Sequence, residues 1–142
     1  MRIFLDSSVL LAASGSALGA SRWVVTRARP LGWTLVCSPY VVAEVSQNLD
    51  RLPAAATAEW TGIRALLAMA DDVLAMDRPV IFASGKDRPI LFTAAAWADV
   101  LLTLDRADFA DVMGGGFYGL PVMTPAEFLN HERASGRLGP WS

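Results

Sequence analysis

The sequence KDRPILFTAAAWADVLLTLDRADF, residues 86–109, contains a complete helix–strand unit with an aspartate near each end. Asp87 stands just before a predicted helix, and Pro89 suits the first turn of that helix because proline needs no backbone donor there. The helix is expected to end near Trp97. Residues 99–103 form an apolar run that predicts a buried strand, and Asp105 follows just past it. Such a unit is typical of an α/β domain with a parallel sheet.

The rest of the chain continues this alternation of strands and helices. Short apolar runs predict further strands at residues 2–5, 34–37, 72–76 and 120–123. Further helices are expected at residues 9–13, 20–28, 39–49 and 54–70. A last helix begins after Thr124, which forms a capping-box pattern with Glu127. Together these patterns predict a three-layer α/β/α sandwich with a central, mostly parallel sheet of four to five strands.

Composition limits the class of protein. The 142 residues are 54% apolar, with a mean hydropathy of +0.38 and a net charge of −2. We expect one domain, residues 1–133, and a C-terminal tail, residues 134–142. The most apolar stretch, residues 90–104, is shorter than the roughly 20 residues of a membrane span, and Asp6 interrupts any signal-peptide pattern. A cytoplasmic protein without membrane association is expected, and the surplus apolar content predicts a homodimer.

Cysteine content and charge add two further limits. Cys37 is the only cysteine, which rules out an internal disulfide, and its place in a predicted strand indicates a buried thiol in a reducing compartment. A pI near 5.2 argues against a free-standing basic clamp for nucleic acid. It does not argue against a nuclease, because an active site that holds a metal ion is itself acidic.

Four acidic residues are expected to meet at one edge of the sheet. The functional crevice of an open parallel sheet lies beyond the carboxyl ends of its strands. Asp6 and Asp105 each follow a predicted strand, Asp87 opens the helix that leads into residues 99–103, and Glu44 lies early in the helix after residues 34–37. Crowded carboxylates repel one another, and these segments offer no Lys or His at the matching positions. A divalent cation is therefore the expected counter-charge.

The ligand types indicate which cation and which chemistry to expect. Carboxylate oxygens without His or Cys favour Mg²⁺ or Mn²⁺ over zinc. Such a site activates water and stabilises the charge that develops on a phosphate during displacement. The sequence therefore predicts phosphodiester hydrolysis.

The chain also resembles the PIN domain family, specifically the small VapC-like ribonucleases of toxin–antitoxin modules. The resemblance covers residues 3 to about 129 and rests on IFLDSSVLL at residues 3–11, SPYVVAEV at 38–45 and the stretch 86–109. It implies that the catalytic and metal-binding residues are Asp6, Glu44, Asp87 and Asp105. It also implies supporting hydroxyls at Ser8 and Thr103, and an auxiliary acid at Asp108. One departure is Leu104, where the family often has a small or polar residue, which implies a narrower pocket or altered metal access.

The same resemblance implies a biological setting. The substrate would be RNA, and the chain would be the toxin of a type II module. A cognate antitoxin would cover the acidic crevice, with a basic side chain as its natural contact. Pairing of two copies would assemble a groove for the RNA.

Other interpretations stay open. A catalytically silent PIN-like scaffold that binds RNA or protein is one, although a pure binder needs no acidic quartet. A receiver-like or phosphatase-like domain with Asp6 as phosphoacceptor is another, but such sites call for a buried lysine, and the only lysine is Lys86. Single acids also have local uses: Asp6 as a helix N-cap, Asp105 as the cap of the turn after it, and Asp108 as the first residue of a short helical turn.

Several remaining features receive a mainly structural interpretation. The tripeptide Asp-Arg-Pro occurs twice: residues 77–79 follow a predicted strand and mark a turn, whereas residues 87–89 carry the candidate ligand. Residues 71–72 are expected at the start of a strand, the wrong end for the crevice. His131 is expected to be an exposed helix residue. A basic–aromatic cluster could bind phosphates and bases or form a solvated helix face: Arg22, Trp23, Arg27, Arg29 and Trp33.

Overall fold

The computed structural model describes residues 1–80, 82 and 84–138. Within them the chain forms one five-stranded sheet in the order β3-β2-β1-β4-β5, and every neighbouring pair of strands is parallel. The strands are β1 (Arg2–Leu5), β2 (Thr34–Cys37), β3 (Ala68–Met69), β4 (Val100–Leu102) and β5 (Val122–Met123). The predicted bounds of the first two strands are confirmed. The central strands consist of continuous apolar runs because helices cover both of their faces.

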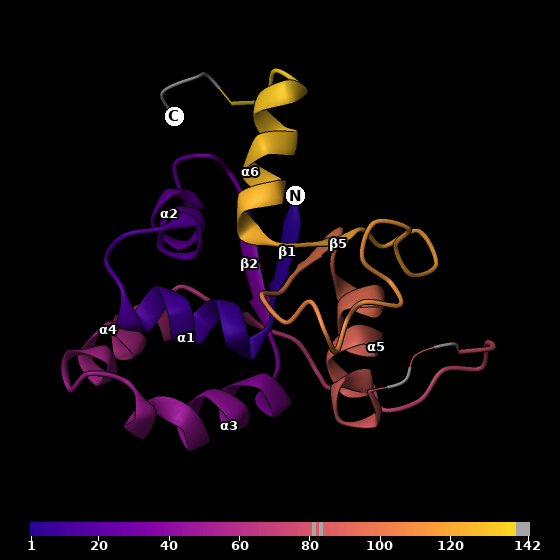
Figure 1. The fold of residues 1–142 in the computed structure, drawn as a ribbon, viewed down its shortest axis with the longest axis horizontal. Coiled ribbons are helices and arrows are strands. Elements are labelled where there is room, and N and C mark those ends of the chain that lie inside the picture. Colours follow the sequence, from indigo (N-terminus) through magenta and orange to yellow (C-terminus); the bar gives the residue numbers. More distant parts are fainter. Residues whose placement is uncertain (81, 83, 139–142) are drawn as a thin grey trace.

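Helices lie on both sides of this sheet (Figure 1). On one side are α1 (Ser7–Gly15), α2 (Ala20–Arg27) and α4 (Ala55–Arg64), and both α2 and α4 contact α1. On the other side α5 (Arg88–Trp97) packs on β1 and β4, while α3 (Pro39–Asn48) contacts both α1 and α5. The last helix, α6 (Pro125–Ala134), packs against α2. The predicted α/β/α sandwich is confirmed.

Side-chain caps define where two of these helices begin. Ser38 accepts a hydrogen bond from the backbone N–H of Val41 at the start of α3. Thr124 accepts one from the backbone N–H of Glu127 at 3.2 Å and starts α6, as the capping-box pattern predicted. Short 3₁₀ turns follow α3 at η1 (Leu49–Arg51) and precede α5 at η2 (Gly85–Asp87).

Among the described residues, no single helix is long and apolar enough to span a membrane. Helices α1 and α2 together reach that length and composition, but the chain bends by 93° between them.

The strand predicted at residues 72–76 is wrong. The third strand is instead the two-residue edge strand β3, because α4 ends at Arg64 rather than near residue 70. Past β3 the chain forms hydrogen bonds with helix α5. The backbone N–H of Val73 donates to Thr93 Oγ1 at 2.8 Å. The indole of Trp97 donates to the carbonyl of Asp71 at 3.2 Å. These contacts draw residues 71–73 away from the sheet.

The position of Asp72 changes accordingly. It lies past the carboxyl end of β3, not at the start of a strand as the sequence interpretation had it. Its carboxylate accepts the backbone N–H of Tyr40, with Oδ2 at 3.2 Å, at the beginning of α3. Asp72 therefore ties the loop after β3 to the helix that carries Glu44.

The chain after α6 folds back onto the domain. Arg137 Nε donates to Glu132 Oε2 at 2.6 Å and its Nη2 to Oε1 at 2.9 Å. Glu132 is only 2% exposed and Leu138 is 5% exposed. The first part of the expected tail thus contributes to the core, and residues 139–142 of that tail lie outside the described residues.

Cys37 is fully buried at the end of β2, as expected from its place in an apolar run. Burial raises the pKa of its thiol to about 12. The thiol is therefore protonated and unreactive at neutral pH.

Candidate active site

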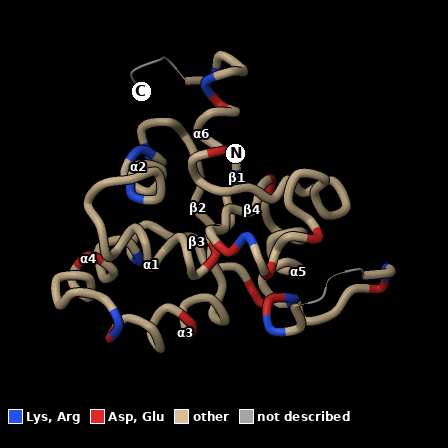
Figure 2. The backbone as a smooth tube through the Cα atoms, in the orientation of Figure 1, with Lys and Arg blue, Asp and Glu red and all other residues tan. Residues whose placement is uncertain are grey.

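Acidic side chains gather at the carboxyl ends of the strands. Figure 2 shows acidic positions from several segments near the start of α5, with a basic position beside them. The segments are the β1–α1 junction, helix α3, the turn η2 and the loop after β4. This is the edge where the topology of a parallel sheet places a functional crevice.

Asp6 occupies the junction between β1 and α1 and is 3% exposed. Its Oδ1 accepts the backbone N–H of Ser7 at 2.8 Å, so Asp6 is indeed the N-cap of α1. Its Oδ2 accepts the hydroxyls of Ser8 and Thr103, both at 2.7 Å. Burial raises the pKa of Asp6, while these hydrogen bonds act in the opposite direction. Two hydroxyl donors are more than a helix cap needs, and they fix the orientation of the carboxylate.

The Thr103 hydroxyl connects two aspartates. It donates to Asp6 and accepts the backbone N–H of Asp105 at 3.0 Å, and Thr103 is completely buried. The Ser8 hydroxyl accepts the N–H of Leu104 at 3.0 Å in the same way. The two hydroxyls thereby attach the loop after β4 to the start of α1. Their support of a metal ligand stays a prediction.

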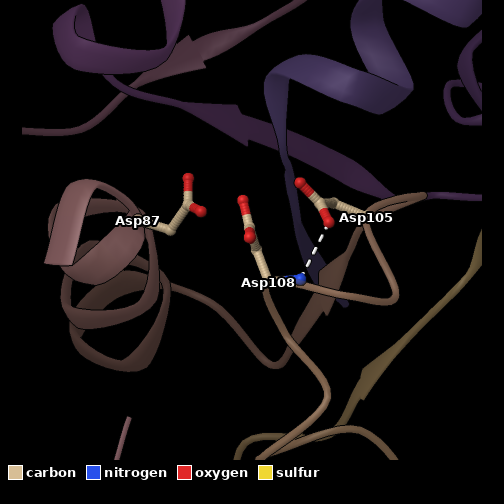
Figure 3. A group of neighbouring side chains, drawn as sticks. All are labelled: Asp87, Asp105 and Asp108. Atoms are coloured by element: carbon tan, nitrogen blue, oxygen red, sulfur yellow. Dashed lines mark hydrogen bonds between the residues drawn. The ribbon is translucent and has the colours of Figure 1, made fainter. Parts of the chain in front are cut away.

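Three carboxylates approach each other closely. One oxygen from each of Asp87, Asp105 and Asp108 lies within 4.8 Å of the other two, which is close enough to share one metal ion. Figure 3 shows the carboxylate of Asp108 between those of the other two. Oδ1 of Asp105 accepts the N–H of Asp108 at 2.9 Å, so Asp105 also caps the turn that follows it. Ser84 donates its hydroxyl to Asp87 Oδ2 at 2.6 Å.

The carboxyl groups of Asp87 and Asp108 shift each other's pKa in opposite directions. Burial raises the pKa of Asp87 to about 6, and the neighbouring Asp108 carboxylate contributes. A hydrogen bond with the Asp87 carboxyl holds the pKa of Asp108 below its usual range, with further contributions from Asp105 and Lys86. Without a bound cation, a proton that the pair shares is therefore held on Asp87. Lys86 Nζ lies 3.4 Å from Asp108 Oδ2, so these carboxylates have a neighbouring cation that the sequence interpretation did not expect.

Glu44 faces the other acids from helix α3. Its Oε1 is buried, and within the described part of the chain it has no hydrogen-bond partner. Burial raises the pKa of Glu44 to about 7, and the charges of Asp6 and Asp87 add to this effect. A buried oxygen without a partner is rare in folded proteins and indicates a missing ligand such as water or an ion.

The structure thus arranges the predicted residues in two sets. Asp87 and Asp105 meet Asp108, which the sequence interpretation had treated as auxiliary. Asp6 and Glu44 lie outside that 4.8 Å group but near enough to interact with it. Burial raises the pKa of Asp6, and the charge of Asp105 adds to this. The charge of Asp87 likewise adds to the effect of burial on the pKa of Glu44. Which of these acids bind metal or act in catalysis stays a prediction.

Tyr40 lies beside these acids and was missed by sequence reasoning. Its hydroxyl donates to the backbone carbonyl of Lys86, next to Asp87. Burial raises the pKa of its phenol, and the nearby charge of Glu44 does so too. The spacing of Tyr40 and Glu44, four residues apart on one helix, was a signal that both face the same side.

Other residues singled out from the sequence lie elsewhere. Asp77 is exposed in a bend, which agrees with the turn expected at residues 77–79. The neighbouring Arg78 lies 5.2 Å from the centre of the Tyr118 ring. The side chain of His131 is 65% exposed on α6, as expected. In the basic–aromatic cluster, Arg22 pairs with Glu59 at 3.3 Å, and Trp33 packs edge-on against Phe128. Arg27 and Arg133 lie over the ring of Trp23 at 5.5 and 5.8 Å.

Comparison with known proteins addresses the fold. No protein-family model matches the chain, and no curated protein matches it. Among solved structures it is similar to a chain of VapBC2 from Rickettsia felis bound to a DNA fragment from their promoter. The TM-score is 0.61 and the identity 14%, over 86% of this chain and 97% of that chain. At this identity the likeness concerns the fold alone, and it confirms the predicted PIN-like fold.

Proposed function

We propose that this chain, which has a VapC-like PIN fold, is a divalent-metal-dependent endoribonuclease and the toxin of a type II toxin–antitoxin module. The observation that carries the proposal is the approach of Asp87, Asp105 and Asp108 to within 4.8 Å at the carboxyl ends of the strands. Asp6 and Glu44 complete the acidic crevice. Uncompensated carboxylates at this density are unfavourable unless a cation binds among them.

The donor set fits Mg²⁺ or Mn²⁺. Every ligand atom in the group of Asp87, Asp105 and Asp108 is a carboxylate oxygen. Hard oxygen donors without imidazole or thiolate suit these two ions. Asp87, Asp105 and Asp108 would hold the ion. Asp6 and Glu44 lie near this group. The chemistry a divalent cation supplies is neutralisation of charge on the phosphate and acidification of a water molecule.

The residues of the chain orient groups and hold protons. Ser8 and Thr103 fix the orientation of Asp6 by donating their hydroxyls to Oδ2. Oδ1 accepts the backbone N–H of Ser7 at 2.8 Å and the Ser7 hydroxyl at 3.4 Å. Glu44, with its pKa raised to about 7, can hold or release a proton at neutral pH. Its Oε1 would accept a proton from the attacking water or return one to the leaving oxygen of the RNA chain.

Partners follow from the same proposal. The solved structure with a similar fold is described as a VapBC2 complex, which supports an antitoxin partner for this chain. That partner would cover the acidic crevice with a basic side chain. A homodimer in the cytoplasm completes the proposal, and three exposed apolar side chains near β3 offer surface for contact: Leu66 (48% exposed), Met69 (52%) and Leu74 (69%).

A silent PIN-like scaffold that binds RNA is the alternative. Binding to RNA relies on positive charge that neutralises phosphates. A crevice with five carboxylates would repel RNA unless a cation occupied it, so the arrangement favours the nuclease.

The test is cleavage of a panel of structured RNAs by the wild type and by Asp6→Asn, each with Mn²⁺ and with EDTA. We expect cleavage by the wild type with Mn²⁺ alone, and loss of it in the variant. Equal cleavage by both proteins would come from a contaminant and would contradict the proposal. A small antitoxin-like reading frame beside the gene would support the assignment as a toxin.

A further inference from the structure

Lys86 is the only lysine of the chain, and it stands at the acidic crevice. Its Nζ lies 3.4 Å from Oδ2 of Asp108, and its side chain is 70% exposed. Among the described residues, no other Lys, Arg or His forms an ion pair with the five acids of the crevice. Arg106, which is close in sequence, pairs with Glu127 instead, at 2.9 Å. Lys86 is thus a single cation at an excess of negative charge.

The backbone of Lys86 is held in place, whereas its exposed side chain forms, among the described residues, only the ion pair with Asp108. The Tyr40 hydroxyl bonds to the Lys86 carbonyl, and the turn η2 places Lys86 directly before Asp87. Ser84 in turn donates to the Asp87 carboxylate at 2.6 Å. A lysine has a flexible four-carbon stem and a point charge, so it can change partners without moving the backbone.

A divalent cation and Lys86 would compete for the same carboxylate. Asp108 is the partner of Lys86 and also the middle member of the group with Asp87 and Asp105. Two cations at one carboxylate repel each other, and the ion pair of an exposed lysine is weak. The divalent ion, bound by several carboxylates, would therefore displace Lys86 from Asp108.

We propose that Lys86 is a resident cation of the crevice that exchanges partners. It pairs with Asp108 while no divalent cation is bound, and it contacts a phosphate of the RNA backbone once the cation has displaced it. The inference rests on the proposed function and adds to it a positioning residue for the substrate.

The first test measures Mn²⁺ binding without RNA, by calorimetry on the full chain. Lys86→Gln removes the competing charge, so we expect it to bind Mn²⁺ roughly three- to fivefold more tightly than the wild type. Lys86→Arg should bind Mn²⁺ like the wild type. The matched control is Arg51→Gln, which removes one exposed positive charge outside the crevice and should leave the affinity unchanged.

The second test measures binding of a cleavage-resistant 2′-O-methyl RNA by fluorescence anisotropy. With Mn²⁺ present, we expect Lys86→Gln to bind roughly threefold to tenfold more weakly than the wild type, with a salt slope smaller by about 0.7. With EDTA the two proteins should bind equally, because Lys86 is then engaged with Asp108. Lys86→Arg should restore the Mn²⁺-dependent affinity.

The outcomes separate this inference from the function it rests on. If the wild type binds Mn²⁺ and Lys86→Gln binds it no more tightly, or if the loss of RNA affinity is the same in EDTA, the partner exchange is wrong and the metal site stands. If the wild type binds no Mn²⁺, the nuclease proposal is wrong and the exchange is wrong with it.

Discussion

The Thr103 hydroxyl donates to Oδ2 of Asp6 at 2.7 Å and so joins the end of β4 to the end of β1. Thr103 Oγ1 also accepts the backbone N–H of Asp105, at 3.0 Å. One buried hydroxyl therefore sets the relative positions of two acids that come from different strands. The crevice depends on such connections because its carboxylates repel each other.

Thr103→Val tests this connection with little change of volume. The buried Asp6 carboxylate would lose one of its hydrogen-bond donors, so we expect the free energy of unfolding to fall by about 1–3 kcal/mol. Urea denaturation measures the change, and Thr103→Ser, which keeps the hydroxyl, is the control. If the valine variant were as stable as the wild type and bound Mn²⁺ equally well, the hydroxyl would have no part in holding the site.

Stability without metal should fall as the pH rises. The pKa of Glu44 is raised from 4.5 to about 7, and that of Asp87 from 3.8 to about 6. Between the lower and the upper pKa of each group, the folded state therefore binds more protons than the unfolded state. Raising the pH from about 5 to 8 therefore removes stability. A shift of one pKa unit corresponds to about 1.4 kcal/mol of stability. Because solvent screens a partly exposed carboxyl, we expect the rise in pH to remove roughly 1–2 kcal/mol of stability through Glu44.

Urea midpoints between pH 5 and 8, measured in EDTA, check this expectation. Glu44→Gln should flatten the profile, since its amide does not titrate. A wild-type profile that rises over the same range would show that the crowded carboxylates are not protonated as described.

The two copies of Asp-Arg-Pro should differ in function. Asp87 is 5% exposed within the carboxylate group, whereas Asp77 is exposed in a bend. We expect Asp87→Asn to lower RNA cleavage by about 100-fold or more, the scale of changes around bound metals. Without metal it should be at least as stable as the wild type at pH 7.5, because one crowded carboxylate is gone. Asp77→Asn is the matched control, and an equal loss of activity in both variants would refute the distinction.

The segment after α6 should be needed for stability. Arg137 neutralises the buried Glu132 through two hydrogen bonds, and Leu138 is buried beside it. Truncation after Ala134 would remove both Arg137 hydrogen bonds from Glu132 and leave only His131 Nδ1, at 4.0 Å from Oε1, so we expect a loss of about 3 kcal/mol. Glu132→Gln in the truncated chain should recover part of it. Thermal unfolding of the three proteins measures both effects, and an unchanged melting temperature after truncation would show that the segment is dispensable.

Much of the fold was predictable because its signals are local. After an exposed first residue, β1 and β2 are apolar and buried, and their predicted bounds match the structure. The positions of Asp6 and Asp105 follow from the topology, since the ends of parallel strands lie at one edge. That both would lie in one acidic crevice was therefore a direct consequence of the strand assignment.

The remaining features depend on contacts between distant segments. Residues 72–76 look like a strand, yet Leu74 is 69% exposed, because Val73 bonds to Thr93 and the chain leaves the sheet. The pairing of Lys86 with Asp108 likewise joins two loops through a flexible side chain, and no periodicity encodes it. The close approach of Asp108 to Asp87 is of the same kind.

The central claim is that these carboxylates form one divalent-metal site. Calorimetric titration of the wild type and of Asp105→Asn with Mn²⁺, at pH 7.5 and without RNA, tests it most directly. We expect one Mn²⁺ per chain in the wild type, and affinity at least tenfold weaker in the variant because a ligand oxygen is lost. Absence of Mn²⁺ binding in the wild type, or equal binding by both proteins, would contradict the claim and favour the silent scaffold.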